Sequence, residues 1–250
     1  MGVGGHREPD LFDHRLLDPP GPAPRQSSVS GRHSLSTQST QVAAYPVQGI
    51  DVSDHQGSVD WKAVKQAGKV FAFLKATDGI TWTDPDFAAN WSGARAAGLL
   101  CGAYHFYETD DDPTAQAQNF LKAVQLAPGD LPPVVDIEKL AAGGSAGQAV
   151  KDLQTWLDAV ETATGRTPLI YTSHGFWTSL GTSAFGRYPL WIAAYGTQSP
   201  TLPAGWSAWT FWQFSESGQV TGVTGPVDLD VFSGSLADLR ALAGLSGNGE

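Results

Sequence analysis

Short apolar runs alternate with amphipathic stretches between residues 47 and 185, and this alternation is the strongest structural signal in the chain. The runs have the length of buried strands, whereas the stretches between them repeat apolar positions at helical spacing. In one such stretch, Leu153, Trp156, Leu157 and Val160 fall on one face. The pattern predicts strands over 47–52, 70–76, 99–107, 133–138 and 169–172, and helices over 59–67, 86–97, 114–124, 147–164 and 176–180.

After residue 185 the helical stretches give way to apolar runs joined by loops that contain glycine and proline. The pattern predicts strands over 190–195, 208–214 and 227–232, and a last helix over 235–242. A strand–helix alternation repeated about five times implies parallel strands joined by crossover helices. With about eight strands and five intervening helices, the fold class is α/β, and we expect an irregular β/α barrel rather than an eightfold symmetric one.

The first 47 residues do not share this pattern. A proline-rich run over 19–24 is followed by a stretch rich in Ser, Thr and Gln up to Gln41, and all nine tryptophans lie after residue 60. Such a segment buries too little apolar surface to offset the entropy of ordering it. We expect residues 1–47 to be a disordered or linker-like extension and residues 48–250 to form one barrel. The extension has no apolar core of a signal peptide.

Composition excludes several classes of protein. A formal net charge of −10 argues against a nucleic-acid groove, which needs clustered Lys and Arg. No apolar run is long enough to span a membrane. The single cysteine, Cys101, rules out an internal disulfide and a cysteine-based zinc site, and His55, His105 and His174 lack a metal-binding spacing. We expect a monomer with no metal and no cofactor.

In a β/α barrel, catalytic residues gather at the carboxyl ends of the strands. The residues predicted there are acids, aromatics and amides, with Lys75 as nearly the only cation. Acids supply proton transfer and aromatic rings stack on sugars, so the set favours a carbohydrate over a phosphate as substrate. The acids are Asp51, Asp136, Glu138 and Asp228, and the candidate substrate contacts are Lys75, Tyr104, His105, Tyr107, Tyr171, Trp191, Tyr195, Trp212 and Gln213.

For several of these residues, a structural role competes with substrate contact. Each of the aromatic residues could simply pack the core, and His105 could be an internal hydrogen-bonded residue of the barrel. Lys75 could be the ion-pair partner of Asp51 or Asp136. Three further tryptophans are assigned to core packing rather than to substrate contact: Trp61, Trp82 and Trp91.

Asp136-Ile137-Glu138 is the sharpest element of the predicted site. Residues i and i+2 of a strand project to the same face, so both carboxyl groups would point into the barrel mouth while Ile137 faces the helices. Two carboxyl groups so close together cannot both ionise freely. The pKa of one of them should therefore rise, as a general acid requires.

Several motifs in order resemble glycoside hydrolase family 25, the Chalaropsis-type lysozymes. They cover about residues 48–235: GIDVSDHQG at 49–57, FLKATDG at 73–79, GAYHFY at 102–107, VDIE at 135–138, LWIA at 190–193, WQF at 212–214 and VDLDVF at 227–232. Asp78 stands where the family more usually has Glu, and Asp230 where Asn is often found.

The resemblance implies a flattened β/α barrel and a muramidase that cuts the β-1,4 bond between N-acetylmuramic acid and N-acetylglucosamine in bacterial peptidoglycan. The family's catalytic acid is similar to Glu138 and its partner carboxylate to Asp136, and its other site acids match Asp51 and Asp228. Localisation outside the cell or at the cell wall would follow, or a phage-type lysin held in the cytoplasm before release.

We expect retention of configuration, because Asp136 is too close to Glu138 for the wide spacing that an inverting enzyme needs. Two retaining routes stay open, a covalent Asp136 ester or attack by the substrate's own acetamido group with Asp136 stabilising the oxazolinium. A catalytically silent glycan-binding barrel is the alternative. A less favoured one is an esterase, since residues 143–147 fit G-x-S-x-G around Ser145.

Overall fold

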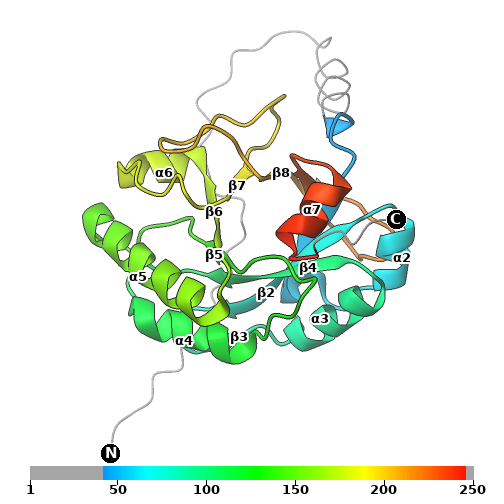
Figure 1. Ribbon diagram of the computed structural model, residues 1–250, viewed down its shortest axis with the longest axis horizontal. Helices are drawn as coiled ribbons and strands as arrows, with labels where there is room; N and C mark the ends of the chain where they lie inside the picture. The colour runs from blue at the N-terminus through cyan, green and yellow to red at the C-terminus, as the bar shows by residue number, and fades with distance from the viewer. Residues whose placement is uncertain (1–41, 246–250) are drawn as a thin grey trace, which may run out of the picture.

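The computed structural model describes residues 42–245, which form a closed barrel of eight strands with one extra strand at its edge (Figure 1). The order around the barrel is β1-β9-β8-β7-β6-β5-β4-β2, closed by pairing of β1 with β2, and β3 pairs with β2 alone. The strands are β1 (Gln48–Val52), β2 (Phe71–Asp78), β3 (Trp82–Thr83), β4 (Leu100–Phe106), β5 (Val134–Asp136), β6 (Leu169–Ser173), β7 (Leu190–Ala193), β8 (Phe211–Gly218) and β9 (Val227–Phe232).

Seven of the barrel strands run parallel, and β9 runs antiparallel to both of its neighbours, β8 and β1. A short loop joins β8 directly to β9, and such a hairpin connection reverses the chain where a crossover helix would not. The predicted α/β barrel of eight strands and five intervening helices is confirmed. The sequence pattern missed the short strand β3 and did not reveal the direction of β9.

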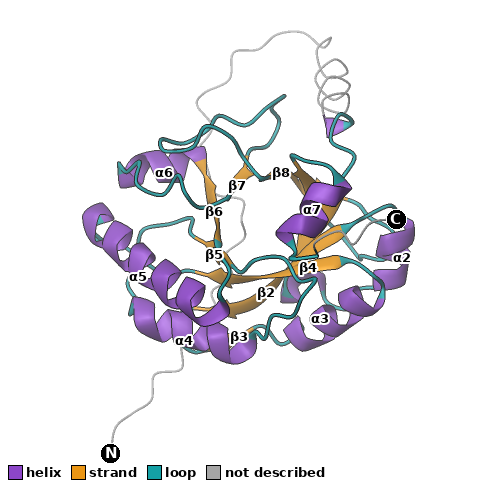
Figure 2. Ribbon diagram, viewed as in Figure 1, coloured by secondary structure: helices purple, strands orange, loops and turns teal. Residues whose placement is uncertain are grey.

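Helices cover the barrel from outside, except beside β7 and β8, where long loops take their place (Figure 2). The helices are α2 (Trp61–Gln66), α3 (Phe87–Ala96), α4 (Pro113–Ala123), α5 (Ala146–Thr164), α6 (His174–Leu180) and α7 (Leu236–Leu242), and a 3-10 turn, η1 (Asp54–Gln56), follows β1. Within the described chain, none of these helices has the length and apolarity needed to cross a lipid bilayer.

Alternation along the strands divides the core into two clusters. One fills the barrel and includes Phe71, Phe73 and Trp191, and the other lies between the strands and the helices. Glycines make room for the large rings inside: a Cβ atom at Gly49 would stand 2.3 Å from the ring of Phe71, and one at Gly102 would stand 2.4 Å from Phe73. Any larger residue at either position would clash inside the barrel.

Helix α7 closes the barrel at the amino ends of the parallel strands. Because β9 runs antiparallel, it finishes at that end, and α7 starts there. Its buried Leu239 joins the interior cluster with Phe211, Phe232 and Phe71. The opposite end, where the parallel strands finish, carries the buried acids Asp51 and Asp136.

The barrel domain starts earlier than the pattern predicts. Val42 and Val47 are buried, and the ring of Tyr45 packs edge-on against Trp209 with 5.0 Å between centroids. Residues 42–47 therefore belong to the packed barrel rather than to the predicted extension. Residues 1–41 of that extension lie outside the described part of the chain.

Candidate active site

Three acids stand together where β1 meets β9, of which Asp51 and Asp230 are buried and Asp228 is half-buried. The register pairs Asp51 with Asp228 and Gly49 with Asp230, so both β9 carboxyls share a face with Asp51. Asp51 lies in hydrogen-bond contact with both of them. We call Asp51, Asp228 and Asp230 the β1–β9 acids. Because residues i and i+2 of a strand share a face, Asp230 lies on the same side of β9 as Asp228. The predicted set of site acids did not include Asp230.

Gln213 on β8 connects the β1–β9 acids to two tyrosines. Its Nε2 donates to Oδ2 of Asp51 at 2.7 Å and to Oδ2 of Asp228 at 3.3 Å. Its Oε1 accepts from the hydroxyls of Tyr171, at 2.8 Å, and Tyr195. The donors and acceptors fix the orientation of the amide, so this one side chain holds groups from β1, β6 and β9 in register.

Asp136 and Glu138, which we call the β5 pair, lie at and just beyond the end of β5. Strand β5 ends at Asp136, earlier than predicted, but the amide of Ile137 still donates to the carbonyl of Tyr171 at 3.0 Å. Ile137 is therefore buried on the helix side, and the two carboxyls lie on the other side in hydrogen-bond contact. The strand alternation that motivated the D-x-E prediction continues through residue 138.

Burial dominates the electrostatics of the β5 pair. It raises the pKa of Glu138 to about 7, with partial opposition from Asp136 as a hydrogen-bond partner and from Lys75 and Lys139. It raises the pKa of Asp136 well above its ordinary value, helped by the negative charge of Glu138. Oδ1 of Asp136 meets no protein donor. Both carboxyls therefore favour the protonated form more than an ordinary acid does, and a carboxyl that holds a proton near neutral pH is what a general acid requires.

Burial also dominates the electrostatics of the β1–β9 acids. It raises the pKa of Asp51 well above normal, that of Asp228 to about 9 and that of Asp230 to about 8, and in each case a neighbouring acid adds to the effect. Asp230 is fully buried, and its Oδ1 accepts from Nε1 of Trp191 at 2.9 Å. Its Oδ2 meets no protein donor, so its contact with Asp51 requires a shared proton.

Two lysines stand at the mouth beside the β5 pair. Nζ of Lys75 lies 2.9 Å from Oδ2 of Asp78 and 4.7 Å from the ring centroid of Phe106. Nζ of Lys139 lies 5.1 Å from the same ring and 3.2 Å from Oε1 of Glu108. The ion-pair partner of Lys75 is thus Asp78 rather than Asp51 or Asp136. Phe106 and Lys139 were absent from the predicted contacts.

Three predicted substrate contacts point away from the acids. His105 lies behind the barrel wall, where its ring nitrogens contact Thr77 at 2.8 Å and Gln116 at 3.1 Å, and its ring stacks on Trp156. Burial lowers the pKa of His105 to about 4, so it stays neutral. Tyr107 and Trp212 are also inaccessible in the layer beneath the helices and loops. Substrate contact by these three residues is therefore not supported.

The other predicted contacts gather around the acids. Tyr104, Tyr171 and Trp191 line the barrel interior, with the Trp191 ring stacked on Phe73 at 4.4 Å. Trp191 is 2% exposed, so it supports the acids from below rather than offering an open surface. Tyr195, at 44% exposure, stands at the rim. Among the described residues, no group of His, Cys, Asp or Glu is arranged to hold a metal ion.

Ser145 has a structural role. Its side chain accepts from the amide of Gln148 at 3.4 Å as the N-cap of α5. The sharp strand-to-helix turn of a nucleophile elbow is absent here, because residues 137–144 form a loop between β5 and α5. The esterase alternative is therefore not supported.

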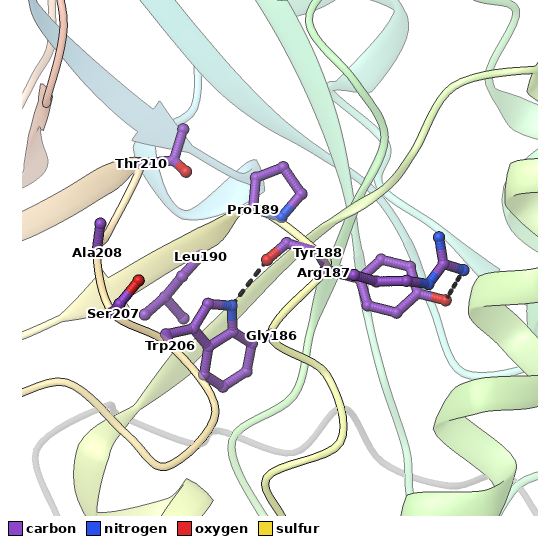
Figure 3. A pocket seen from close by; sticks show the side chains of 9 residues that line it. All are labelled: Gly186, Arg187, Tyr188, Pro189, Leu190, Trp206, Ser207, Ala208 and Thr210. Carbon is purple, nitrogen blue, oxygen red and sulfur yellow. Dashed lines mark hydrogen bonds between the residues drawn. The ribbon is translucent and has the colours of Figure 1, made fainter.

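A separate pocket of about 240 Å³ lies at the far end of the barrel (Figure 3). Leu190, which begins β7, and Thr210, which directly precedes β8, help to line it, so it opens at the amino ends of these strands. Nε1 of Trp206 donates to the carbonyl of Tyr188 at 2.7 Å, and the guanidinium of Arg187 donates to the Tyr188 hydroxyl. This pocket takes no part in the site of the acids.

Comparison with known proteins gives concordant matches. Residues 50–223 match the model of the glycosyl hydrolases family 25. Lysozyme M1 of Streptomyces globisporus is 41% identical over 209 residues, which cover 79% of this chain and 71% of that protein. N,O-diacetylmuramidase of Chalaropsis sp is 32% identical over 213 residues, which cover 79% and 99%. The crystal structure of the bacterial lysozyme from Streptomyces coelicolor aligns with a TM-score of 0.77 at 38% identity, covering 80% of this chain and 98% of that one.

The closed barrel, its buried carboxyl groups and these matches define the chain as a glycoside hydrolase. It belongs to glycosyl hydrolases family 25, a family of lysozymes and muramidases. The resemblance seen in the sequence motifs and the prediction of an enzyme are both confirmed.

Proposed function

We propose that this enzyme hydrolyses the β-1,4 bond between N-acetylmuramic acid and N-acetylglucosamine in bacterial peptidoglycan, with retention of configuration. The observation that carries the proposal is the β5 pair, two carboxyls in contact at the end of β5 whose pKa values are both raised by burial. The relatives named as a lysozyme and as N,O-diacetylmuramidases support the substrate class.

Glu138 is the general acid and base. Its pKa of about 7 lets it hold a proton at neutral pH and give it to the leaving glycosidic oxygen. As the proton leaves, Asp136 faces a growing positive charge on the sugar and is stabilised in its ionised form. Glu138 is left ionised by this transfer, and it then accepts a proton from the water that opens the oxazolinium.

Asp136 stabilises an oxazolinium formed by the substrate's own acetamido group. Retaining enzymes with a carboxylate nucleophile separate their two carboxyls by about 5–5.5 Å, on either side of the scissile bond. Here both come from one strand end and lie in hydrogen-bond contact. This closeness suits a carboxylate that assists the acetamido group more than one that attacks the sugar carbon from the opposite face.

The β1–β9 acids and Gln213 orient the sugar. Because Gln213 ties Asp51 and Asp228 to Tyr171 and Tyr195, these side chains form one hydrogen-bonded network that extends from β1 to Tyr171, beside Asp136. Lys75 and Tyr104 complete the contacts. The enzyme acts on the wall as a monomer, outside the cytoplasmic membrane or after release of a phage-type lysin, in line with relatives named autolytic lysozyme and endolysin.

Mass spectrometry of a peptidoglycan digest tests the bond that is cut. We expect fragments with N-acetylmuramic acid at the new reducing end, and proton NMR of the first product should show the β-anomer. Reducing ends on N-acetylglucosamine would contradict the proposed bond. Binding to walls without new reducing ends would establish the silent glycan-binding alternative.

The route of retention has its own test. Glycan strands stripped of their N-acetyl groups should resist cleavage if the acetamido group attacks. With Asp136→Ala, added azide should fail to restore turnover or to yield a glycosyl azide. Recovery of turnover with such an adduct would establish Asp136 as the covalent nucleophile.

A further inference from the structure

Only a few large apolar side chains of the described chain are exposed to solvent. Five are more than a third exposed, and three of them stand at the carboxyl end of the barrel. Ile80 and Trp82 belong to the hairpin that joins β2 to β3, and Tyr195 follows β7. The other two, Leu236 and Leu245, accompany α7 at the opposite end. Exposed apolar groups gathered beside a catalytic site mark contact with a ligand more often than scattered ones do.

The hairpin that carries Trp82 is held rigidly. Strand β3 pairs Trp82 with Asp78 of β2, and Nδ2 of Asn119 on α4 donates to the carbonyls of Gly79 at 3.0 Å and Trp82 at 3.1 Å. The backbone is thus fixed from two sides, while 39% of the Trp82 residue stays exposed. A preordered ring loses little conformational entropy when a ligand covers it. The assignment of Trp82 to core packing is therefore wrong.

Trp82 connects to the catalytic carboxyls through an unbroken row of side chains. Nζ of Lys75 lies 5.1 Å from the Trp82 ring centroid and 4.7 Å from that of Phe106. Phe106 pairs in register with Asp136 across β4 and β5. Because adjacent strands lie about 4.8 Å apart, β2 stands about 10 Å from β5, which is farther than one sugar ring reaches.

The barrel order places exposed rings on both sides of the β5 pair. Strand β5 has β4 and then β2 on one side, and β6 and then β7 on the other. Trp82 stands beyond the first of these flanks and Tyr195 beyond the second. A polymer laid across the mouth from Tyr195 to Trp82 passes the β5 pair midway, as cleavage within a chain requires.

We propose that Trp82, with Ile80 beside it, forms an outlying sugar subsite that stacks on a hexose of the glycan strand being cut, on the β2 side of the β5 pair. This inference rests on the proposed function. The occupant is a pyranose ring, whose C–H face packs on an aromatic ring. Its continuity with the β5 pair through Lys75 and Phe106 argues for the same strand rather than for a separate ligand. The subsite binds only strands long enough to reach it.

Steady-state kinetics on two substrate lengths test the subsite. With long, uncrosslinked glycan strands, Trp82→Ala should raise KM about five- to tenfold and leave kcat unchanged, because the stacking is the same in ground and transition states. With a disaccharide, which places only one sugar on each side of the bond, it should change neither constant. Trp82→Phe should restore most of the affinity. Leu236→Ala is the matched control, since Leu236 is also 39% exposed but lies at the other end of the barrel.

A different kinetic result with the Trp82→Ala variant would overturn the inference. If Trp82→Ala lowers kcat equally on both substrates and shifts the pH profile, then Trp82 acts by positioning Lys75 and holds no sugar. An unchanged KM on long strands would overturn it as well.

Binding measurements separate this inference from the proposed function. Calorimetry with long strands and the Glu138→Gln protein gives a Kd that needs no turnover, and adding Trp82→Ala should raise that Kd about five- to tenfold. If wild-type protein cleaves no glycan but Trp82→Ala still weakens binding, the proposed reaction fails and the subsite stands. If binding is unchanged by Trp82→Ala, the subsite fails whatever the reaction.

Discussion

Two groups of buried acids share one end of the barrel, and they differ in what surrounds them. The β5 pair lies in the field of Lys75 and Lys139, which oppose the effect of burial on Glu138. The β1–β9 acids contact neutral donors, Gln213 and Trp191, and the charge of Lys69 offsets only a small part of the burial of Asp230. Burial is the leading cause in both groups, but neighbouring acids add to it at the β1–β9 acids, whereas Lys75 and Lys139 oppose it at Glu138.

This difference separates acids that move a proton from acids that keep one. Near the lysines, the pKa of Glu138 is about 7, where a carboxyl can both give and take a proton at neutral pH. Burial and the charges of neighbouring acids raise the pKa values of Asp228 and Asp230 to about 9 and about 8. Acids with such raised pKa values favour the protonated form at neutral pH, which suits them to positioning rather than to proton transfer. The predictions below test this division.

The largest effect should come from Glu138→Gln. The amide keeps the size of the side chain but cannot deliver a proton, so kcat should fall by about two to four orders of magnitude while wall binding survives. Turbidity clearing and reducing-end assays measure this loss. Glu108→Gln is the control, because Glu108 is a nearby carboxyl paired with Lys139. More than about a tenth of activity left in Glu138→Gln would show that the acid is misassigned.

Asp136→Asn should be nearly as damaging for another reason. It removes the negative charge that stabilises the developing positive charge on the sugar, at a cost of about two to three orders of magnitude in kcat. Asp51→Asn and Asp228→Asn should cost less, because we assign these acids to orientation. If Asp51→Asn were the more damaging change, the β1–β9 acids would carry the proton transfer and the division would be reversed.

Lys75→Met should move the pH profile. Removal of this positive charge raises the pKa of Glu138 further, so the protonated acid persists to higher pH. The alkaline limb of kcat should therefore shift upward by about half a pH unit to one unit from its position near 7. Lys62→Met, on the exposed surface of α2, should leave the limb in place. If the alkaline limb of Lys75→Met is unchanged or moves to lower pH, then the charge of Lys75 does not lower the pKa of Glu138.

The smallest effect concerns stability. Because folding raises the pKa of Asp230 to about 8, its contribution to stability is complete below pH 4 and is lost as pH rises toward 8. Asp230→Asn cannot lose a proton, so the decline of Tm between pH 5 and 8 should become shallower by a few degrees. Asp158→Asn, on the exposed face of α5, should follow the wild-type slope. An unchanged slope in Asp230→Asn would show that Asp230 is ionised in the folded protein.

Strand periodicity explains which parts of the site were predictable. It predicted the shared face of Asp136 and Glu138, and the barrel confirmed the strands that carry them. Applied strictly, the same rule excludes His105 once Tyr104 faces inward, and Trp212 once Gln213 does, because neighbours on a strand point to opposite faces. The expected contact list included both members of each pair. Strand periodicity alone therefore separates the inward residues of these two strands from the outward ones.

Other features depend on contacts between distant segments. Trp82 looks like a core residue by composition, and only the pairing of β3 with β2 and the bonds from Asn119 hold its ring at the surface. The packing of Tyr45 on Trp209 likewise joins segments far apart in the chain. No local pattern encodes such contacts, so the boundary of the barrel and the outlying rim were not predictable.

The reversed direction of β9 has a consequence for how the enzyme can be attached to a support. Strand β1 begins at the amino ends of the parallel strands, and β9 returns the chain to that same end, where α7 leads to Leu245 beside Gly129. Both ends of the described chain therefore leave from the floor of the barrel. A bead or a fused anchor joined at either end would hold the enzyme upright, with its mouth turned outward.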